Sequence, residues 1–250
     1  MTEQTQGTYV YGVVRGGASL DAVRRGGDGL ADVHLVEADD LAAVVSSSPE
    51  RATRDSVLGH AQVLEAALES SPVVPLRFGL VLTDEDAVRR EILDAHHDKL
   101  VELLQRFDGR VQMTLKAYYD EEAIVGALMV SEPELQRLRE VTSQGSEEQT
   151  YKERVRLGEL INKGLEQRRG PAGNEILERL KPLAVAVELN PPEDELMVAH
   201  AAFLIERARQ HEFEEALEAV AREHQELMRF RLLGPMPPYD FVEMQEPAWA

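Results

Sequence analysis

The sequence predicts an α+β protein with two domains, of which at least the second is ferredoxin-like, joined by a charged helical connector. Short β-branched and aromatic runs alternate with amphipathic helical segments in both halves of the 250-residue chain. Between these halves, residues 131–181 are highly charged and mostly helical in pattern. We therefore expect an N-terminal α+β domain at 8–130, the connector at 131–181, and a C-terminal ferredoxin-like unit with an extended tail at 182–243.

The N-terminal domain begins with the run TYVYGVV, whose aromatic and β-branched residues predict a strand. Two further strands are joined by a tight turn at 38–40. The hydroxyl of Thr83 is expected to cap a long helix, and Gly109 to end it. In order, we expect a strand at 8–14, a short helix at 20–25, strands at 33–37 and 41–46, a helix at 53–70, a strand at 73–82, a helix at 84–107 and a strand at 110–119.

The connector and the C-terminal unit contain a second set of elements. Polar interruptions of the connector are expected at 145–146 and 170–174, and an apolar stripe at helical spacing runs from Tyr151 to Leu165. Two strands, a helix and a strand, joined to the preceding helix, form most of a ferredoxin-like unit. We expect them as strands at 183–189 and 196–205, a helix at 210–226 and a strand at 228–233.

The composition excludes several classes of protein. A formal net charge of −19 repels nucleic acid phosphates and anionic lipid, so we expect no nucleic acid and no membrane partner. The absence of cysteine excludes disulfides, zinc ribbons and thiol catalysis, and it fits a reducing compartment. The start MTEQTQGTYV carries neither a basic region nor an apolar run, so we expect a cytoplasmic protein without a signal peptide.

No motif for catalysis or cofactor binding stands out in the sequence. The chain lacks a P-loop, a dinucleotide-binding fingerprint and a nucleophile elbow. His96 and His97 are adjacent, whereas two metal ligands on one helix face need a spacing of three or four residues. His96 instead falls on the apolar stripe of the 84–107 helix, which favours a partly buried histidine with a hydrogen-bond partner. We therefore expect no catalytic residue, no cofactor and no metal.

The segment VVPLRFGLVL at 73–82 places a proline, an arginine and a glycine inside a hydrophobic strand. Period-2 geometry sends Pro75, Arg77 and Gly79 to one face of that strand. A residue without an N–H, a fixed charge and a bare backbone suit an edge strand, or a surface that another molecule approaches closely. The opposite face is the expected core face, with Val74, Leu76, Phe78, Leu80 and Leu82.

Four segments taken in order form a specific set, although each alone is weakly specific. They are TYVYGVV at 8–14, PLRFG at 75–79, GRVQMTLKAYYD at 109–120 and GPMPPYDF at 234–241. Together they resemble the gas vesicle synthesis protein GvpL/GvpF family, and the resemblance runs from about Thr8 to Val242. One departure is Met236, where the resemblance leads us to expect an aromatic residue in many members.

The resemblance implies an accessory protein and not an enzyme. Gas vesicles are hollow protein shells assembled from a small, very hydrophobic subunit, and the family is implied to bind that shell subunit and other gas vesicle accessory proteins. The implied location is cytoplasmic, in association with gas vesicles. A large net negative charge would keep a complex with such a subunit dispersed. Two alternatives stay open: a small-ligand-binding regulatory module with a ferredoxin-like cleft, and an enzyme in which His60, His96 and two carboxylates converge.

The first implied partner-binding place is the edge strand. Pro75, Arg77, Phe78 and Gly79 would form a docking place there, either for an added strand or for a partner helix laid beside it. For Arg77 itself we favour a structural role, as an ion pair with an acid of the 84–107 helix.

The second implied place is the proline-rich tail. Tyr239 and Phe241 lie two residues apart on a chain expected to be extended, so they face the same side and can fill apolar pockets together. We favour a latch, in which both pack back onto the protein's own domains, over insertion into a partner.

Overall fold

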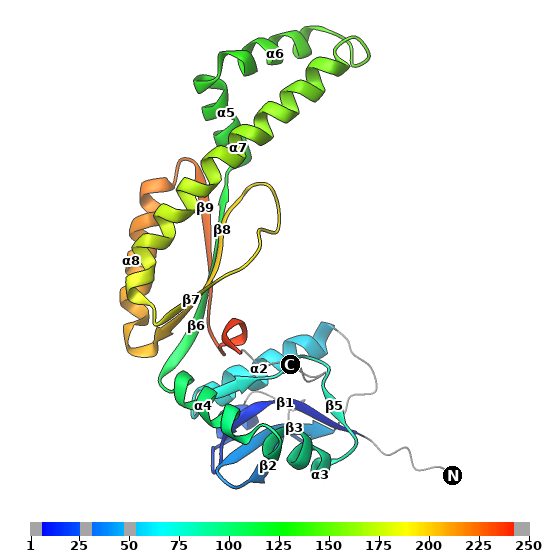
Figure 1. Cartoon of the computed structure of the whole chain (residues 1–250), viewed down its shortest axis with the longest axis vertical. Coiled ribbons are helices and arrows are strands. Elements are labelled where there is room, and N and C mark those ends of the chain that lie inside the picture. Colours follow the sequence, from blue (N-terminus) through cyan, green and yellow to red (C-terminus); the bar gives the residue numbers. More distant parts are fainter. Residues whose placement is uncertain (1–6, 26–31, 48–53, 243–250) are drawn as a thin grey trace, which may run out of the picture. The chain divides into compact units, whose positions relative to one another are not determined.

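The computed structural model of the chain describes residues 7–25, 32–47 and 54–242 (Figure 1). These residues form helices and antiparallel sheets, which confirms the α+β prediction. They divide into two compact units, one made of the residues up to Gln112 together with those from Gly234, the other of Met113–Leu233. Both expected domain boundaries, after residues 130 and 181, fall inside the second unit.

The first unit is built on a sheet in which the described residues supply five strands. Its order is β2-β3-β1-β4, and β5 also pairs with β1, so β1 is central and nearly all buried. The predicted hairpin is confirmed: β2 and β3 pair antiparallel across a turn in which Asp39 has a φ of 51°, in the left-handed region. The strands are β1 (Thr8–Arg15), β2 (His34–Ala38), β3 (Leu41–Ser47), β4 (Val73–Pro75) and β5 (Val81–Leu82).

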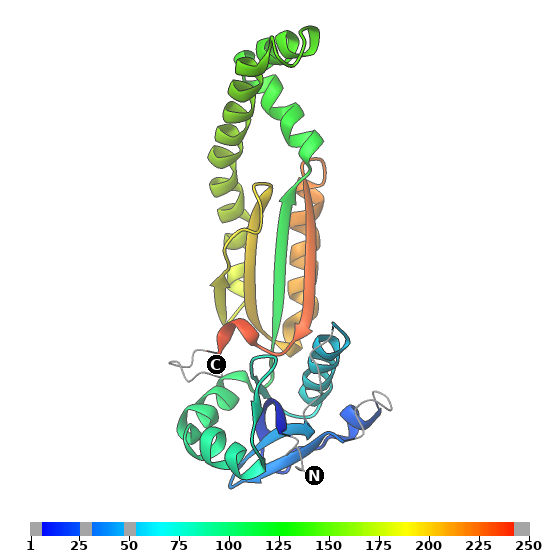
Figure 2. The ribbon, with the colours of Figure 1, turned by 90° about the vertical axis from the view of Figure 1, so that its right-hand side faces the viewer.

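Helices lie on both sides of this sheet (Figure 2). On one side lies α2 (Arg54–Leu68), with the short α1 (Asp21–Arg25) against it. On the other side are α3 (Glu85–Val88), the π-helical segment η2 (Arg89–Asp94) and α4 (His97–Phe107). The core between the layers is dense, because residues from both helical layers are fully buried: Leu64, Ile92, Leu100, Leu103 and Phe107.

The single helix predicted at 84–107 is interrupted. Asp84, not Thr83, is the N-cap, because its side chain accepts a hydrogen bond from the backbone N–H of Ala87 at 2.7 Å. The π-helical segment and a turn then separate α3 from α4, which begins after His96. His96 is partly buried. Gly109 follows the end of α4 with a φ of 65°, as expected of a helix-terminating glycine.

The continuous strand predicted at 73–82 is wrong. β4 ends at Pro75, and β5 begins only at Val81. Between them Gly79 has a φ of 90°, which an extended strand does not permit. The alternation of faces therefore fails, and Val73 and Val74 are both fully buried. The predicted edge position holds for β4, which ends the strand order of this sheet.

The second unit contains a four-stranded sheet with the order β7-β8-β6-β9. Helices separate β6 from β7 and β8 from β9, which is the ferredoxin-like arrangement that we predicted. Its inner strand β6 comes from the segment expected in the N-terminal domain, and β9 continues past its predicted end at Leu233. The strands are β6 (Arg110–Tyr119), β7 (Ala186–Leu189), β8 (Met197–Glu206) and β9 (Met228–Met236).

One face of the second sheet is covered by α8 and the C-terminal half of α7 (Figure 1). The rings of Phe203 on β8 and Phe213 on α8 lie 5.1 Å apart at this interface. The helices are α5 (Glu121–Ser131), α6 (Pro133–Gln144), α7 (Tyr151–Leu180) and α8 (Gln210–His224), with 3-10 turns η3 (Lys181–Leu183) and η4 (Arg207–Arg209).

The predicted interruption at 145–146 is confirmed between α6 and α7, but that at 170–174 is wrong. Pro171 lies inside α7, which runs unbroken past it. At Gly173 the helix approaches β8 so closely that a Cβ would lie 2.7 Å from the Val198 carbonyl oxygen. Ile176 and Leu180 continue this contact and are fully buried. Packing on the sheet thus offsets the hydrogen bond that proline removes.

Candidate functional site

The residues predicted to dock a partner lie in and around the loop that joins β4 to β5. Both ends of this loop are fixed to β1: the Leu76 N–H donates to the Tyr11 carbonyl at 3.0 Å, and the Val10 N–H donates to the Leu80 carbonyl at 3.0 Å. The positive φ of Gly79 makes the turn between them. The loop is therefore held at a defined position on the edge of the first sheet.

The structure places the four predicted loop residues differently from one another. Arg77 and Gly79 are exposed, and Phe78 is partly buried. Pro75 is buried in β4, where it pairs with Gly12 of β1, so it does not belong to an accessible face. We call the surface formed by Arg77, Phe78 and Gly79 the 77–79 loop.

Beneath the 77–79 loop lies a cluster of aromatic side chains in the first unit. The hydroxyl of Tyr9 accepts a hydrogen bond from the Gly79 N–H at 3.2 Å and lies 2.9 Å from Nδ1 of His60. The hydroxyl has one proton and two lone pairs, so the tautomer of His60 decides which of the two atoms donates this hydrogen bond. Burial lowers the pKa of His60, because it disfavours the charged ring.

Ring contacts extend the cluster in both directions. The Tyr11 and His60 rings stack with centroids 5.4 Å apart. The ring of Phe78 is T-shaped to that of His60, with centroids 5.7 Å apart, and to that of Tyr9, with centroids 6.2 Å apart. The Tyr11 hydroxyl pairs with Oγ of Ser46 at 3.1 Å. The loop thus rests on side chains that are themselves fixed by hydrogen bonds and packing.

Sequence reasoning missed Tyr9, Tyr11 and His60 as the support of the loop. The two tyrosines have strand spacing in TYVYGVV, so a shared face was readable from the sequence. His60 stands on α2, far along the chain from both tyrosines, and only the packing of α2 on β1 brings it to them.

The tail residues are not on an extended path, which corrects that expectation. Tyr239, Asp240 and Phe241 form the 3-10 turn η5 (Tyr239–Phe241), so the two aromatic side chains do not point to the same side. Phe241 is 1% exposed, whereas Tyr239 is 38% exposed. Gln112 holds the turn from both sides: its amide donates to the Asp240 carboxylate, and its carbonyl accepts from the Asp240 N–H at 3.0 Å.

Tyr239 lies beside α2 and the aromatic cluster. Desolvation by the surrounding chain, together with the negative charge of Glu65, raises its pKa to about 12. Its phenol is therefore neutral at physiological pH and can donate a hydrogen bond. Of the two predicted tail residues, Phe241 is buried and Tyr239 reaches the surface of the first unit.

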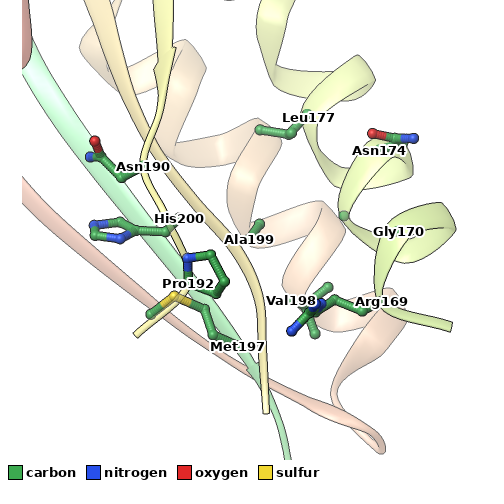
Figure 3. Close-up of a pocket in the computed structure, with 11 residues that line it drawn as sticks. Arg169, Gly170, Asn174, Leu177, Asn190, Pro192, Met197, Val198, Ala199 and His200 are labelled. Atoms are coloured by element: carbon green, nitrogen blue, oxygen red, sulfur yellow. The ribbon is translucent and has the colours of Figure 1, made fainter. Parts of the chain in front are cut away.

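The small-ligand alternative has its own candidate, a pocket between α7 and β8 (Figure 3). Its volume is about 240 Å³. The polar side chains of Arg169, Asn174 and His200 line it from different sides and do not converge on one point (Figure 3). Nδ1 of His200 already lies 3.2 Å from the Pro191 carbonyl oxygen. Specific small-ligand sites instead have a few polar groups aimed at one place.

Within residues 7–25, 32–47 and 54–242, no three His, Asp or Glu side chains are grouped so that they could hold a metal ion. In the same part of the chain, no helix has the length and apolar character needed to span a bilayer.

Known proteins resemble this chain along nearly its whole length. The family described as "Gas vesicle synthesis protein GvpL/GvpF" matches residues 7–243. Gas vesicle protein F of Streptomyces sp. (strain CB03234) is 34% identical over 241 residues, which cover 94% of this chain and 99% of the relative.

Two crystal structures are similar in fold. Gas vesicle protein GvpF from Anabaena sp. PCC7120 has a TM-score of 0.78 and 27% identity, and GvpF from Microcystis aeruginosa has a TM-score of 0.74 and 25% identity. Each comparison covers 96% of this chain and 100% of the other. The fold is therefore shared over both compact units.

Proposed function

The chain belongs to the gas vesicle synthesis protein GvpL/GvpF family, and from this premise we propose that it is a non-enzymatic accessory protein that binds the hydrophobic shell subunit during assembly. The gas vesicle-related role follows from the family. The contact with the shell subunit, contacts with other accessory proteins and a place of action in the cytoplasm, next to gas vesicles, are parts of the proposal.

The observation that carries the proposal is the 77–79 loop. Arg77 and Gly79 are exposed on a loop whose two ends are hydrogen-bonded to β1 and whose middle rests on the Tyr9–His60 pair. A surface held in place before binding loses little conformational entropy when a partner docks. It offers a guanidinium, part of an aromatic ring and a backbone without a side chain, which together suit a protein surface.

The charge of the chain supports the same role. A net charge of −19 disfavours association between copies of this protein. Bound to a hydrophobic subunit, such a chain would keep the complex dispersed until the subunit is incorporated into a shell.

The test is retention of the purified shell subunit by the immobilised full-length chain. Arg77→Glu reverses the charge of the loop at an exposed position, so we expect at least a tenfold loss of retention with a change in unfolding free energy below about 1 kcal/mol. The matched control is Arg90→Glu, which makes the same change at another exposed arginine of the first unit. Equal retention by both variants would place the contact elsewhere, and no retention by the unmodified chain would refute the proposed function.

A further inference from the structure

The second unit contains a groove between α5 and α7 that its own chain leaves unfilled. In Figure 2 the two helices lie apart next to the sheet and approach each other toward α6. The groove between them has a volume of about 1030 Å³. We call it the α5–α7 groove. Its apolar lining comes from α5, from α7 and from the loop before β8: Val125, Gly126, Met129, Leu157, Ile161 and Leu196.

The apolar walls of the groove are incompletely covered. Val125, Leu157 and Ile161 are only partly buried, whereas Leu128 and Leu165 on the same two helices are buried in the unit. Apolar surface that remains in contact with water stabilises a complex when a partner covers it. The groove is also larger than the pocket of Figure 3 and open, which suits a macromolecular segment better than an enclosed small ligand.

A glycine in the groove has no role in the packing of the described residues. A Cβ at Gly126 would meet none of their atoms within 4 Å, although glycine inside a helix lowers stability relative to alanine. Gly164 on α7 is different, because a Cβ there would lie 2.6 Å from a methyl carbon of Leu128. The fold explains Gly164. The bare backbone at Gly126 instead lets the backbone of another molecule approach α5 closely.

The charges that line the groove differ between its two ends. Glu121 and Glu122 are exposed at the start of α5, beside an ion pair between Asp120 and Arg229. Arg139 lines the groove from α6, which follows the far end of α5. An occupant therefore meets two carboxylates where α5 leaves the sheet and a guanidinium toward α6.

We propose that the α5–α7 groove binds one amphipathic α-helix of the shell subunit, with basic residues directed to Glu121 and Glu122. The naming of this partner rests on the proposed function. A helix fits because two helical walls offer ridges and grooves to a third, and the missing side chain at Gly126 permits close approach. α5 has 11 residues, so at 1.5 Å per residue the groove accommodates about three helical turns.

The experiment uses the full-length chain and the purified shell subunit. Gly126→Leu fills the groove, and because the position is open we expect an unchanged or higher melting temperature together with at least a tenfold loss of retention. The matched control is Gly59→Leu in α2, another helical glycine at which a Cβ meets none of the described residues within 4 Å. It should retain the subunit.

A second variant keeps the proposal testable if Gly126→Leu folds poorly. Glu121→Lys with Glu122→Lys reverses two exposed charges, so it should weaken retention, and the difference from the unmodified chain should shrink as salt rises. Full retention by a folded Gly126→Leu chain, or by the double lysine variant, overturns the groove proposal and leaves the proposed function standing.

Two further outcomes are decisive. If the unmodified chain retains no shell subunit, the proposed function fails and this partner fails with it. If sedimentation shows that the unmodified chain self-associates and that Gly126→Leu does not, the occupant is a second copy of the chain and the proposal is overturned.

Discussion

Two helical glycines of the second unit, Gly173 and Gly126, differ in how closely other residues pack against the position that a side chain would occupy. At Gly173 the space that a side chain would take is already occupied, since a Cβ would lie 2.7 Å from the Val198 carbonyl oxygen. At Gly126 no described residue reaches that space within 4 Å. The same residue type therefore serves the fold of α7 on β8 in one place and leaves a surface uncovered in the other.

The neighbours of each glycine support this contrast. Ile176 and Leu180, which follow Gly173 on α7, are fully buried. Val125 and Ile161, which line the α5–α7 groove near Gly126, remain partly exposed. Completeness of packing thus separates a face that the chain needs for itself from a face available to another molecule.

The largest loss of stability is expected at the tail, where the side chain of Phe241 is fully buried. Phe241→Ala removes a fully packed ring, so the first unit should lose about 3–5 kcal/mol of unfolding free energy. Urea denaturation with a probe in the first unit measures it. Tyr239→Ala is the comparison, and its smaller expected loss follows from its 38% exposure. Equal losses of unfolding free energy at the two positions would mean that the complete burial of Phe241 adds no stability beyond that of the partly exposed Tyr239.

The two glycines themselves give the next test. Gly173→Ala forces the Val198 backbone to move, and such overpacking should cost about 1–3 kcal/mol. Gly126→Ala fits without a contact and should instead stabilise the second unit by about 0.5–1 kcal/mol, because alanine is the better helix former. Thermal unfolding measures both changes. Shifts of the same sign in the two variants would mean that the packing around the two glycines does not differ as described.

The smallest change in stability is expected from the titration of His60 in the aromatic cluster beneath the 77–79 loop. Burial lowers the pKa of His60, so its contribution is present above about pH 6.5, the unfolded value, and is lost as pH falls through the lower folded value. His34 and His97 act in the opposite sense. His34 donates to the backbone carbonyl of Asp32 and His97 donates to the carboxylate of Asp40, and these hydrogen bonds raise the pKa values of both histidines. Their stabilisation is lost as pH rises, so their contribution to the pH dependence of stability opposes that of His60.

The measurement for His60 compares the unmodified chain with His60→Gln at pH 7.5 and 5.5. Glutamine does not titrate in this range, so the stability difference between the two proteins should narrow at the lower pH. A difference that stays constant would show that His60 does not resist protonation in the folded chain.

Local patterns in the sequence predicted much of the fold. The hairpin of β2 and β3, the strand β6 and the helix α8 follow from periodicity and turn residues that lie within a few positions of one another. The break between β4 and β5 could not be predicted in this way, because a glycine within an apolar run is compatible with both a strand and a turn. The continuation of α7 past Pro171 was not predicted either, because it depends on packing against β8, which is distant in the sequence.

The candidate site was less predictable than the fold. Arg77 and Gly79 stood out because they interrupt an apolar run, and both are exposed. Their support by Tyr9 and His60 joins three elements that are separate in sequence. The groove at Gly126 left no signal at all, since a single helical glycine looks the same whether its missing side chain is used by the fold or not.

The first unit is assembled from two separate stretches of sequence, with the whole of Met113–Leu233 placed between them. The residues that complete it, Asp240 on Gln112 and the buried Phe241, are therefore the last described part of the chain to leave the ribosome. The second unit is continuous and has its entire sequence available earlier. The first unit therefore begins to be synthesised before the second unit, but its described residues are completed after those of the second unit.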